Sequence, residues 1–284
     1  MDRAALYGIL DQFLAALKAR DAGSLPWASA VRHSENNVML EPGDGVWATN
    51  TGLGDYDLRF ADPVTGQVGW FGSVIEPLEE SAICLRLGIN QAGQIAEAEM
   101  VIVRDSEYGM ALPGKRFWDK PRLTAEPVAP ASRQTLLELA DGYFSTLQLN
   151  DGTINTRFAP DCNRVENGVQ TTNNPELTLF HWASMGCEEQ FKLGIYRYDD
   201  RLRGRRFPLV DEERGLVFAF GFIDHSGRLG RYQLADGTWN DSPIRRPHSF
   251  YLGELFKIDH GMIEAIEANF ISVPYHMPSP WDAA

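Results

Sequence analysis

The segment Gly93–Arg104 reads GQIAEAEMVIVR, a turn glycine followed by a strand-like run of residues. A similar segment, Gly261–Val273, reads GMIEAIEANFISV and begins 168 residues further along the chain. In both segments a glycine is followed two residues later by isoleucine and then by four residues of which two are glutamates, AEAE in the first and EAIE in the second. A repeat at this distance in a chain of 284 residues predicts two copies of one domain.

Two earlier pairs of segments support the duplication. Asp11–Leu17 (DQFLAAL) aligns with Asp141–Leu147 (DGYFSTL), and Ser34–Val38 (SENNV) aligns with Val165–Val169 (VENGV). The spacing between the copies is 130 or 131 residues at these points and grows to 168 at the last strand, so the longer insertions are expected in the second copy.

Each copy begins with an expected helix and continues as strands. Residues 2–20 carry apolar side chains at three- and four-residue spacing, and residues 133–152 show a second such run, with Ser132 as its expected N-cap. Strand-like runs separated by glycine-rich turns follow, an order typical of an α+β fold. We predict a first domain over residues 1–104, a Pro-rich linker over 105–130, and a second domain over 131–284 with a Pro-rich tail.

Composition limits the classes of function. The formal charge of −13 and the isoelectric point near 4.9 argue against a nucleic-acid partner, which requires a basic surface. No apolar run is long enough to span a membrane, and the N-terminus lacks a secretory signal pattern. The three cysteines are far apart and are expected to be buried free thiols, so we expect a cytoplasmic protein.

A helix ending near an aspartate, a strand with a Glu-Asn or Glu-Pro element, and a final G-x-I-x-x-x-E strand resemble the nuclear transport factor 2-like superfamily. This superfamily includes ketosteroid isomerases and SnoaL-like polyketide cyclases. The resemblance implies two tandem cone-shaped α+β barrels, each a curved antiparallel sheet wrapped around helices. It also implies a homo-oligomer.

The whole chain is also similar to a narrower group of two-copy proteins from bacteria and fungi. The similarity lies in SENNVMLEPGDGVW, ADPVTGQVGWFG, VENGVQTTNNP, RRFPLVDEERG and the closing YHMPSPW. One sphingomonad branch of that group consists of cofactor-independent lyases, which release formaldehyde from a lignin-derived β-1 diaryl diol and leave a stilbene. The resemblance implies this class of reaction and a small aromatic substrate.

Strand alternation separates inward from outward side chains in the last strand of copy one. With the superfamily pattern as a guide, we expect Met100 and Arg104 to point into the cone. Glu97 and Glu99 then point outward, where either could form a cross-strand ion pair with Arg86. A guanidinium at the cone mouth could hold a phenolate or alkoxide, so Arg104 is a catalytic candidate. Ser272 replaces it in copy two, which favours copy one as the working site.

Two further candidates follow from the isomerase resemblance. Glu41 precedes a proline at the end of the first strand, where a catalytic carboxylate is expected to have apolar surroundings; an ordinary turn is the alternative. Tyr143 occupies the place of an oxyanion-binding tyrosine, and a core tyrosine is the alternative. Copy one has Phe13 at that place, and copy two has Thr171-Thr172-Asn173 where Glu41 stands, so neither copy has both groups.

Histidines and aromatic residues complete the candidate set. His33 lies beside Glu35 and could form an acid–base pair with it. We expect His181, in an apolar helix beside Trp182, to contact the substrate. Three aromatic side chains near the glycine-rich loop are expected to stack on an aromatic substrate, with core packing as the alternative: Trp47, Tyr56 and Trp70.

The sequence contains no HExxH, GxSxG or Walker motif, and no GxGxxG opening a helix, so we predict neither a metal nor a cofactor. The expected function is a cofactor-independent carbon–carbon lyase. It would break a lignin-derived diaryl diol through a quinone methide. Another isomerase, dehydratase or cyclase of the same fold, and a non-catalytic ligand-binding or assembly protein, remain alternatives.

Overall fold

The computed structural model describes residues 1–104, 120–178 and 181–282. The chain forms two compact units, Met1–Ala111 with Ser279–Ala284, and Leu112–Pro278. The final residues therefore belong to the first unit, whereas the sequence prediction included them in the second domain. Residues 105–119 of the predicted linker lie outside the described residues.

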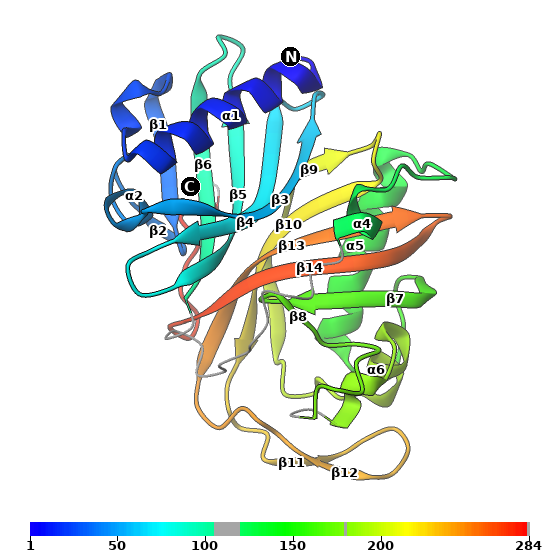
Figure 1. The fold of residues 1–284 in the computed structure, drawn as a ribbon. Helices are drawn as coiled ribbons and strands as arrows, with labels where there is room; N and C mark the ends of the chain where they lie inside the picture. The colour runs from blue at the N-terminus through cyan, green and yellow to red at the C-terminus, as the bar shows by residue number, and fades with distance from the viewer. Residues whose placement is uncertain (105–119, 179–180, 283–284) are drawn as a thin grey trace. The chain divides into compact units, whose positions relative to one another are not determined.

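In the first unit a helix lies across one face of a curved sheet (Figure 1). Helix α1 (Arg3–Ala19) begins at Asp2, whose carboxylate accepts a hydrogen bond from the Ala5 N–H, and ends at Arg20 in the left-handed conformation. The sheet order is β2-β1-β6-β5-β4-β3. Its elements are β1 (Trp27–Glu35), β2 (Val38–Met39), β3 (Gly52–Asp62), β4 (Gln67–Ile75), β5 (Glu80–Ile89) and β6 (Ile95–Val103), with the short helix α2 (Val46–Thr49) before β3.

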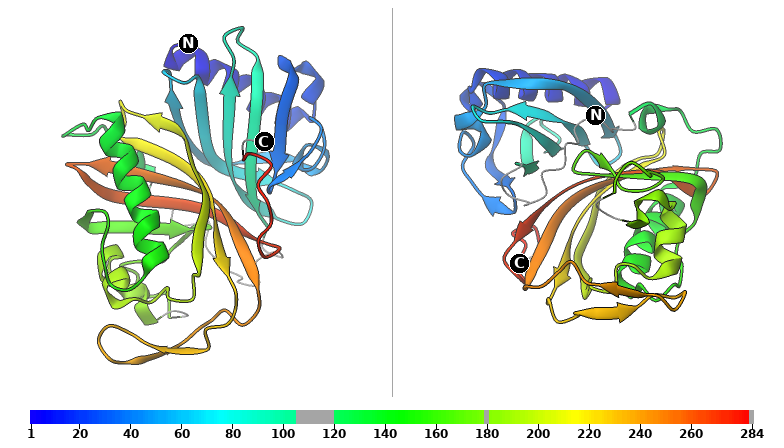
Figure 2. Two further views of the ribbon diagram at one scale, coloured as in Figure 1. Left: turned by 180° about the vertical axis from the view of Figure 1, so that it is seen from behind. Right: turned by 60° about the horizontal axis from the view of Figure 1, so that its bottom comes forward.

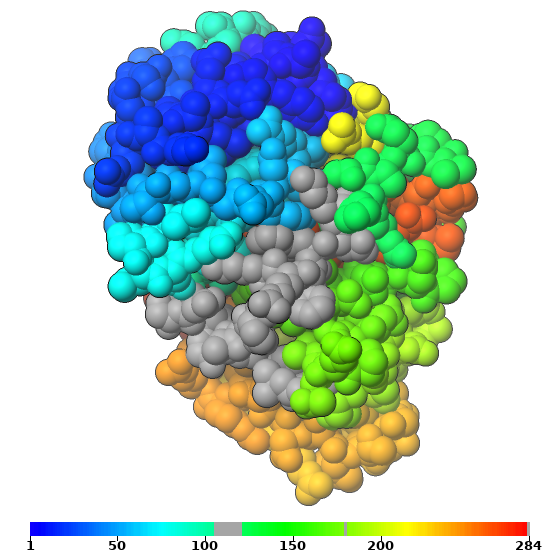
Figure 3. All heavy atoms as spheres, viewed as in Figure 1, coloured from blue at the N-terminus to red at the C-terminus, as the bar shows by residue number. Residues whose placement is uncertain are grey.

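The apolar stripe of α1 provides the core of this unit. Leu6, Leu10, Phe13 and Leu17 are fully buried against side chains of the sheet, as the three- and four-residue spacing predicts. The opposite side of the helix forms part of the molecular surface (Figure 3).

The second unit repeats this plan with insertions. Helix α5 (Arg133–Leu149) crosses one face of a sheet of order β8-β7-β14-β13-β10-β9 (Figures 1 and 2). Its strands are β7 (Phe158–Glu166), β8 (Val169–Gln170), β9 (Arg201–Asp211), β10 (Leu216–His225), β13 (His248–Asp259) and β14 (Met262–Val273). The remaining elements are α4 (Lys120–Thr124), α6 (Cys187–Leu193), a 3₁₀ turn (His181–Ser184) and the hairpin of β11 (Arg231–Gln233) and β12 (Trp239–Asp241).

Strand order and register relate the two units position by position in the first, fifth and sixth strands of each sheet. In both, the first strand pairs in parallel with the last: His33 opposite Ala98 in one unit, and Arg164 opposite Ile266 in the other. The predicted tandem α+β fold is therefore confirmed. Each sheet is mixed, not purely antiparallel, and neither closes into a barrel among the described strands.

On the outer face of the first sheet, the predicted ion pairing of Arg86 is confirmed, but the predicted exposure of Glu99 is wrong. Arg86 on β5 contacts both carboxylates of β6, with Nη1 2.6 Å from Glu97 Oε2 and Nη2 3.0 Å from Glu99 Oε2. Glu99 is nevertheless fully buried, although the alternation predicts an outward and therefore exposed side chain. Trp281, which forms part of this unit, lies against the same face, with its ring centre 5.0 Å from the Arg86 guanidinium.

Candidate functional site

A buried polar cluster lies in the second unit, on the sheet face that packs against α5. The register places Arg164 opposite Ile266 and Glu254 opposite Ala268, on the same face as the core residues of this unit. The cluster combines six side chains from four elements and one loop: Tyr143 of α5, Arg164 and Glu166 of β7, Gln190 of α6, Tyr196 after α6, and Glu254 of β13.

Arg164 is the centre of the cluster. Its side chain is 2% exposed, and its Nε lies 3.3 Å from a Glu166 carboxylate oxygen. Its Nη2 donates to Gln190 Oε1 at 2.7 Å and to the Tyr196 hydroxyl. A buried guanidinium is tolerated only where its donors are satisfied, and these partners come from β7, α6 and the loop that follows α6.

Glu254 is the acid of the cluster. Burial, together with the nearby Glu166 carboxylate, raises the pKa of Glu254 to about 8, although the Arg164 charge opposes the change. The Tyr143 hydroxyl is hydrogen-bonded to this carboxyl group, and burial raises the pKa of Tyr143 as well. At neutral pH the site therefore holds a mostly protonated carboxylic acid beside a fixed positive charge, an arrangement suited to general acid catalysis.

Aromatic rings surround the cluster. The Tyr143 ring lies 5.0 Å from Phe256, 5.4 Å from Phe191 and 6.1 Å from Phe158, in edge-to-face contacts. The Arg164 guanidinium lies 5.1 Å from the Tyr196 ring centre. The low polarity of these walls explains why the pKa of Glu254 rises so far.

The equivalent positions of the first unit are largely apolar. Phe13 takes the place of Tyr143, and Leu85, which pairs with Met100, takes the place of Glu254. Only the acid of the first strand is retained, since Glu35 corresponds to Glu166. The acid–base group found in the second unit is therefore absent from these positions of the first.

His33, the equivalent of Arg164, is fully buried. Burial lowers its pKa, against the weaker influence of the Leu40 and Glu41 carbonyl groups, so the ring is neutral at pH 7. Its nitrogens form no hydrogen bond of normal geometry with the described residues. The ring lies 6.3 Å from Trp27, which also contacts Trp47 at 6.4 Å.

Arg104 lies at the end of β6 and is doubly paired. Its Nε is 2.6 Å from Glu76 Oε2, and its Nη2 is 3.1 Å from Glu35 Oε1. Glu35 also accepts a hydrogen bond from the Val46 N–H at 2.6 Å. Two carboxylates compensate this guanidinium, so it holds α2 and the strand ends together and has little attraction left for a substrate anion.

The other candidate residues predicted from the sequence lie in different parts of the first unit and do not form one site. Trp47, Trp70 and Met100 pack in the interior of the first unit with His33. Tyr56 is buried but is not part of the core that packs against α1. Glu41 is exposed in a turn, so the apolar surroundings expected for it are not found.

His181 is exposed in a 3₁₀ turn against Trp182, and not in the longer helix that the sequence suggested. Of the predicted residues, Tyr143 alone belongs to the polar cluster. The cluster's other members were missed, although the 131-residue offset that aligns Glu35 with Glu166 also aligns His33 with Arg164. A lone acid in the apolar run SFYLGELF was the available signal for Glu254.

A second buried pair lies at the far end of the same sheet face. His225 Nε2 is 2.9 Å from Asp199 Oδ1, and the His225 ring stacks on His248 at 4.7 Å. Burial raises the pKa of Asp199. His248 is six residues from Glu254 along β13, roughly 20 Å at the rise of a strand. The Glu166 carboxylate of the cluster also contributes to the raised pKa of Asp199, so the pair and the cluster are electrostatically connected.

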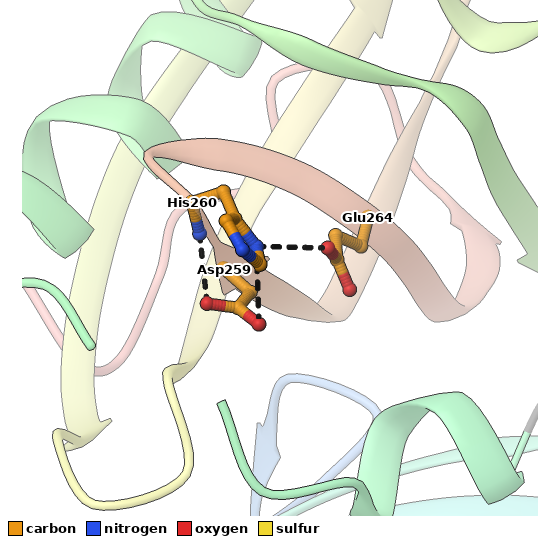
Figure 4. Close-up of side chains that lie close together, drawn as sticks. All are labelled: Asp259, His260 and Glu264. Carbon is orange, nitrogen blue, oxygen red and sulfur yellow. Dashed lines mark hydrogen bonds and ion pairs between the residues drawn. The ribbon is translucent and has the colours of Figure 1, made fainter. Parts of the chain in front are cut away.

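Three side chains at the β13–β14 turn have the composition of a cation site (Figure 4): Asp259, His260 and Glu264. Both Asp259 oxygens already accept backbone hydrogen bonds, from Val128 and Ala129 at 2.7 Å each. We therefore assign Asp259 the structural role of fixing the segment before α5 to this hairpin.

Residues 129–270, half of the chain, match the family model described as a domain of unknown function, DUF8021. The chain belongs to this family, and the matched range includes every residue of the polar cluster. No curated protein matches the sequence significantly.

Three solved structures with a local likeness each match between 36% and 50% of the chain. A protein from Agrobacterium tumefaciens, described as an isomerase of the SnoaL-like family, is 15% identical over 36% of this chain and 99% of its own, with a TM-score of 0.26. AclR from Streptomyces galilaeus, described as a hydroxylase, is 14% identical over 50% and 83%, with a TM-score of 0.31.

The Mtr2–Mex67 M domain complex of C. albicans is 13% identical over 50% of this chain and 96% of the matched chain, with a TM-score of 0.30. Likenesses at these scores carry no functional inference. Among the described helices, none is both long and apolar enough to cross a membrane.

Proposed function

We propose that the polar cluster of the second unit is the active site of a cofactor-independent lyase. Its substrate is a lignin-derived β-1 diaryl diol, and its products are a stilbene, formaldehyde and water. The observation that carries the acid–base part of this proposal is the buried Glu254, whose pKa of about 8 makes it a proton donor at neutral pH. The substrate and the carbon–carbon cleavage rest on the sequence resemblance.

The proposed reaction has two phases. Glu254 gives its proton to the benzylic hydroxyl, which leaves as water, while the phenol of the same ring releases its proton to a solvent water and the ring becomes a quinone methide. The resulting Glu254 carboxylate then takes the proton of the terminal hydroxyl. The carbon–carbon bond to that terminal carbon breaks, formaldehyde leaves, and the electron pair forms the stilbene double bond and restores the phenolate, which takes a proton back from solvent.

Arg164 and Tyr143 have supporting roles in this scheme. The fixed charge of Arg164 stabilises the phenolate oxygen as negative charge returns to it. The Tyr143 hydroxyl orients the Glu254 carboxyl group through their hydrogen bond. The rings of Phe158, Phe191 and Phe256 suit a substrate that is itself mostly aromatic.

The test is an assay of the purified full chain with the diaryl diol, in which formaldehyde and stilbene are measured together. The proposal predicts equal amounts of both, and a loss of about 10²–10⁴-fold in turnover for Glu254→Gln. Glu41→Gln, at an exposed acid of the first unit, is the matched control and should retain full activity.

Other outcomes separate the competing functions. A new product without formaldehyde points to an isomerase, dehydratase or cyclase. Binding of the diol without turnover points to a ligand-binding protein. Full activity of Glu254→Gln contradicts the assigned site even if formaldehyde is released.

We also propose a homo-oligomer, as the superfamily resemblance implies, and a cytoplasmic location, which the three buried free cysteines support. The mass of the purified chain in solution, measured by light scattering, tests the association. A mass of 31.8 kDa at all concentrations contradicts it.

A further inference from the structure

The closing motif YHMPSPW is not part of the proposed active site. Its last residue, Trp281, lies in a slot formed by Ser34, Arg32 and Arg86. Ser279–Asp282 belong to the first unit, although they follow the second unit in the sequence. They lie on the sheet face opposite α1, because Ser34, Arg86 and Glu99 alternate with the core residues His33, Leu85 and Met100.

Trp281 is the anchor of this segment. It is 6% exposed, and its indole N–H donates to Ser34 Oγ at 3.0 Å. The guanidinium groups of Arg32 and Arg86 lie 4.4 Å and 5.0 Å from the ring centre. The two guanidinium groups contact the face of the indole ring, and the hydrogen bond to Ser34 uses the only donor on its edge.

The residues beside Trp281 are also recognised. The Pro280 carbonyl accepts a hydrogen bond from Arg32 Nη2. Ser279 Oγ accepts from the Trp281 N–H at 3.1 Å, which fixes the local turn. Pro278 and Pro280 limit the conformations of the free segment, so less entropy is lost when it binds.

The slot has its own internal charge balance. The Arg86 side chain is 2% exposed and is compensated by Glu97 and Glu99, with Gln67 Oε1 accepting a further hydrogen bond at 2.8 Å. Arg86 can therefore face an aromatic ring without requiring an anion from the segment. Arg32 lies 3.9 Å from Glu97 and is oriented in the same way.

We propose that this outer face of β1, β5 and β6 is a receptor site for a proline–tryptophan peptide, occupied by the chain's own Ser279–Asp282. The segment binds to the first unit of its own chain, and it does so only after the second unit, which precedes it in the sequence, has been synthesised. A peptide of the same sequence competes for the slot when the intrachain anchor is removed.

The test uses the full-length Trp281→Ala chain as the receptor and a synthetic peptide with the sequence of Tyr275–Asp282. Binding is measured by calorimetry. The peptide should bind this variant, bind the unmodified chain at least about tenfold more weakly, and lose at least about tenfold in affinity when its own tryptophan is alanine. Trp239→Ala, at an exposed tryptophan, is the control and should bind no more than the unmodified chain.

Hydrogen exchange of the Trp281 indole N–H keeps the proposal testable if the variant folds poorly. In the unmodified chain it should exchange at least about tenfold more slowly than that of Trp239, and Ser34→Ala should remove much of the protection. No peptide binding at millimolar concentration, equal binding to both chains, or exchange as fast as Trp239 overturns the proposal.

Discussion

The two units share one scaffold but have different interiors. Where the second unit has Tyr143, Arg164 and Glu254, the first has Phe13, His33 and Leu85. The strand order and the parallel pairing of first and last strands are the same in both. The comparison shows that this fold accepts either an apolar core or a buried acid–base cluster at the same positions, so a site must be identified from side chains and not from the fold.

The largest expected effect comes from removing the central charge of the cluster. Arg164→Met leaves the buried Gln190 Oε1 and the Tyr196 hydroxyl without their charged donor, and it removes the partner of Glu166. It should lower the free energy of unfolding by about 2–4 kcal/mol. The equivalent change in the first unit, His33→Met, removes a neutral ring and should cost less than half as much. Denaturant unfolding of both variants measures the difference, and equal losses contradict the distinction between the units.

A pH-dependent change follows from Glu254. Its pKa rises from an ordinary 4.5 to about 8 on folding, so the folded chain binds this proton more tightly than the unfolded chain. The resulting stabilisation is fully present below pH 4.5 and is lost as the pH rises through about 8, by up to a few kcal/mol.

Thermal unfolding of the unmodified chain and of Glu254→Gln between pH 5 and 9 measures this contribution. The difference between the two curves should shrink or reverse as the pH rises. A constant difference across the range contradicts the raised pKa. Leu85→Gln is the matched control in the first unit, and it should shift the curve without changing its slope.

A smaller change in the free energy of unfolding is expected when the tyrosine and phenylalanine at the two equivalent helix positions, Tyr143 and Phe13, are each replaced by the other residue type. Tyr143→Phe removes the hydrogen bond to Glu254 and should cost about 1–2 kcal/mol. Phe13→Tyr adds a buried hydroxyl where the surroundings are apolar and should also destabilise, by about 1–3 kcal/mol. If Phe13→Tyr is neutral, the first interior is more polar than its residues indicate.

The smallest effect is expected for His33→Leu. Burial lowers the pKa of His33, so its folded form resists protonation, and its contribution is lost as the pH falls below about 6.5. The variant should unfold within about 1 kcal/mol of the unmodified chain at pH 7 and should be less sensitive to acid. Greater acid sensitivity of the variant argues for a charged His33.

Much of the fold could be predicted from the sequence, because periodicity is a local signal. The three- and four-residue spacing located α1 and α5, and the repeated G-x-I segments located β6 and β14. Alternation also placed Glu97 and Glu99 on the outer face with Arg86. The burial of Glu99 could not be predicted, since the same face also holds Trp281, which lies over Arg86 and is about 180 residues from Glu99 in the sequence.

The candidate site was harder to predict than the fold. Tyr143 was suggested by family resemblance, but Arg164, Gln190 and Glu254 come from three elements that only the tertiary structure brings together. A single charged residue in an apolar strand gives no periodic signal. Arg104 was predicted as a catalytic residue from its expected place at the cone mouth. Its pairing with Glu35 and Glu76 could not be predicted, because both carboxylates come from distant parts of the sequence.

The central claim is that Glu254 is a neutral acid inside the second unit. A ¹³C NMR titration of the side-chain carboxyl groups, with Glu254 assigned through Glu254→Gln, tests it without any assumption about substrate. The account predicts that this carboxyl group titrates near pH 8, far above the ordinary 4.5. Titration near 4.5 would contradict it and would remove the proton donor from the proposed reaction.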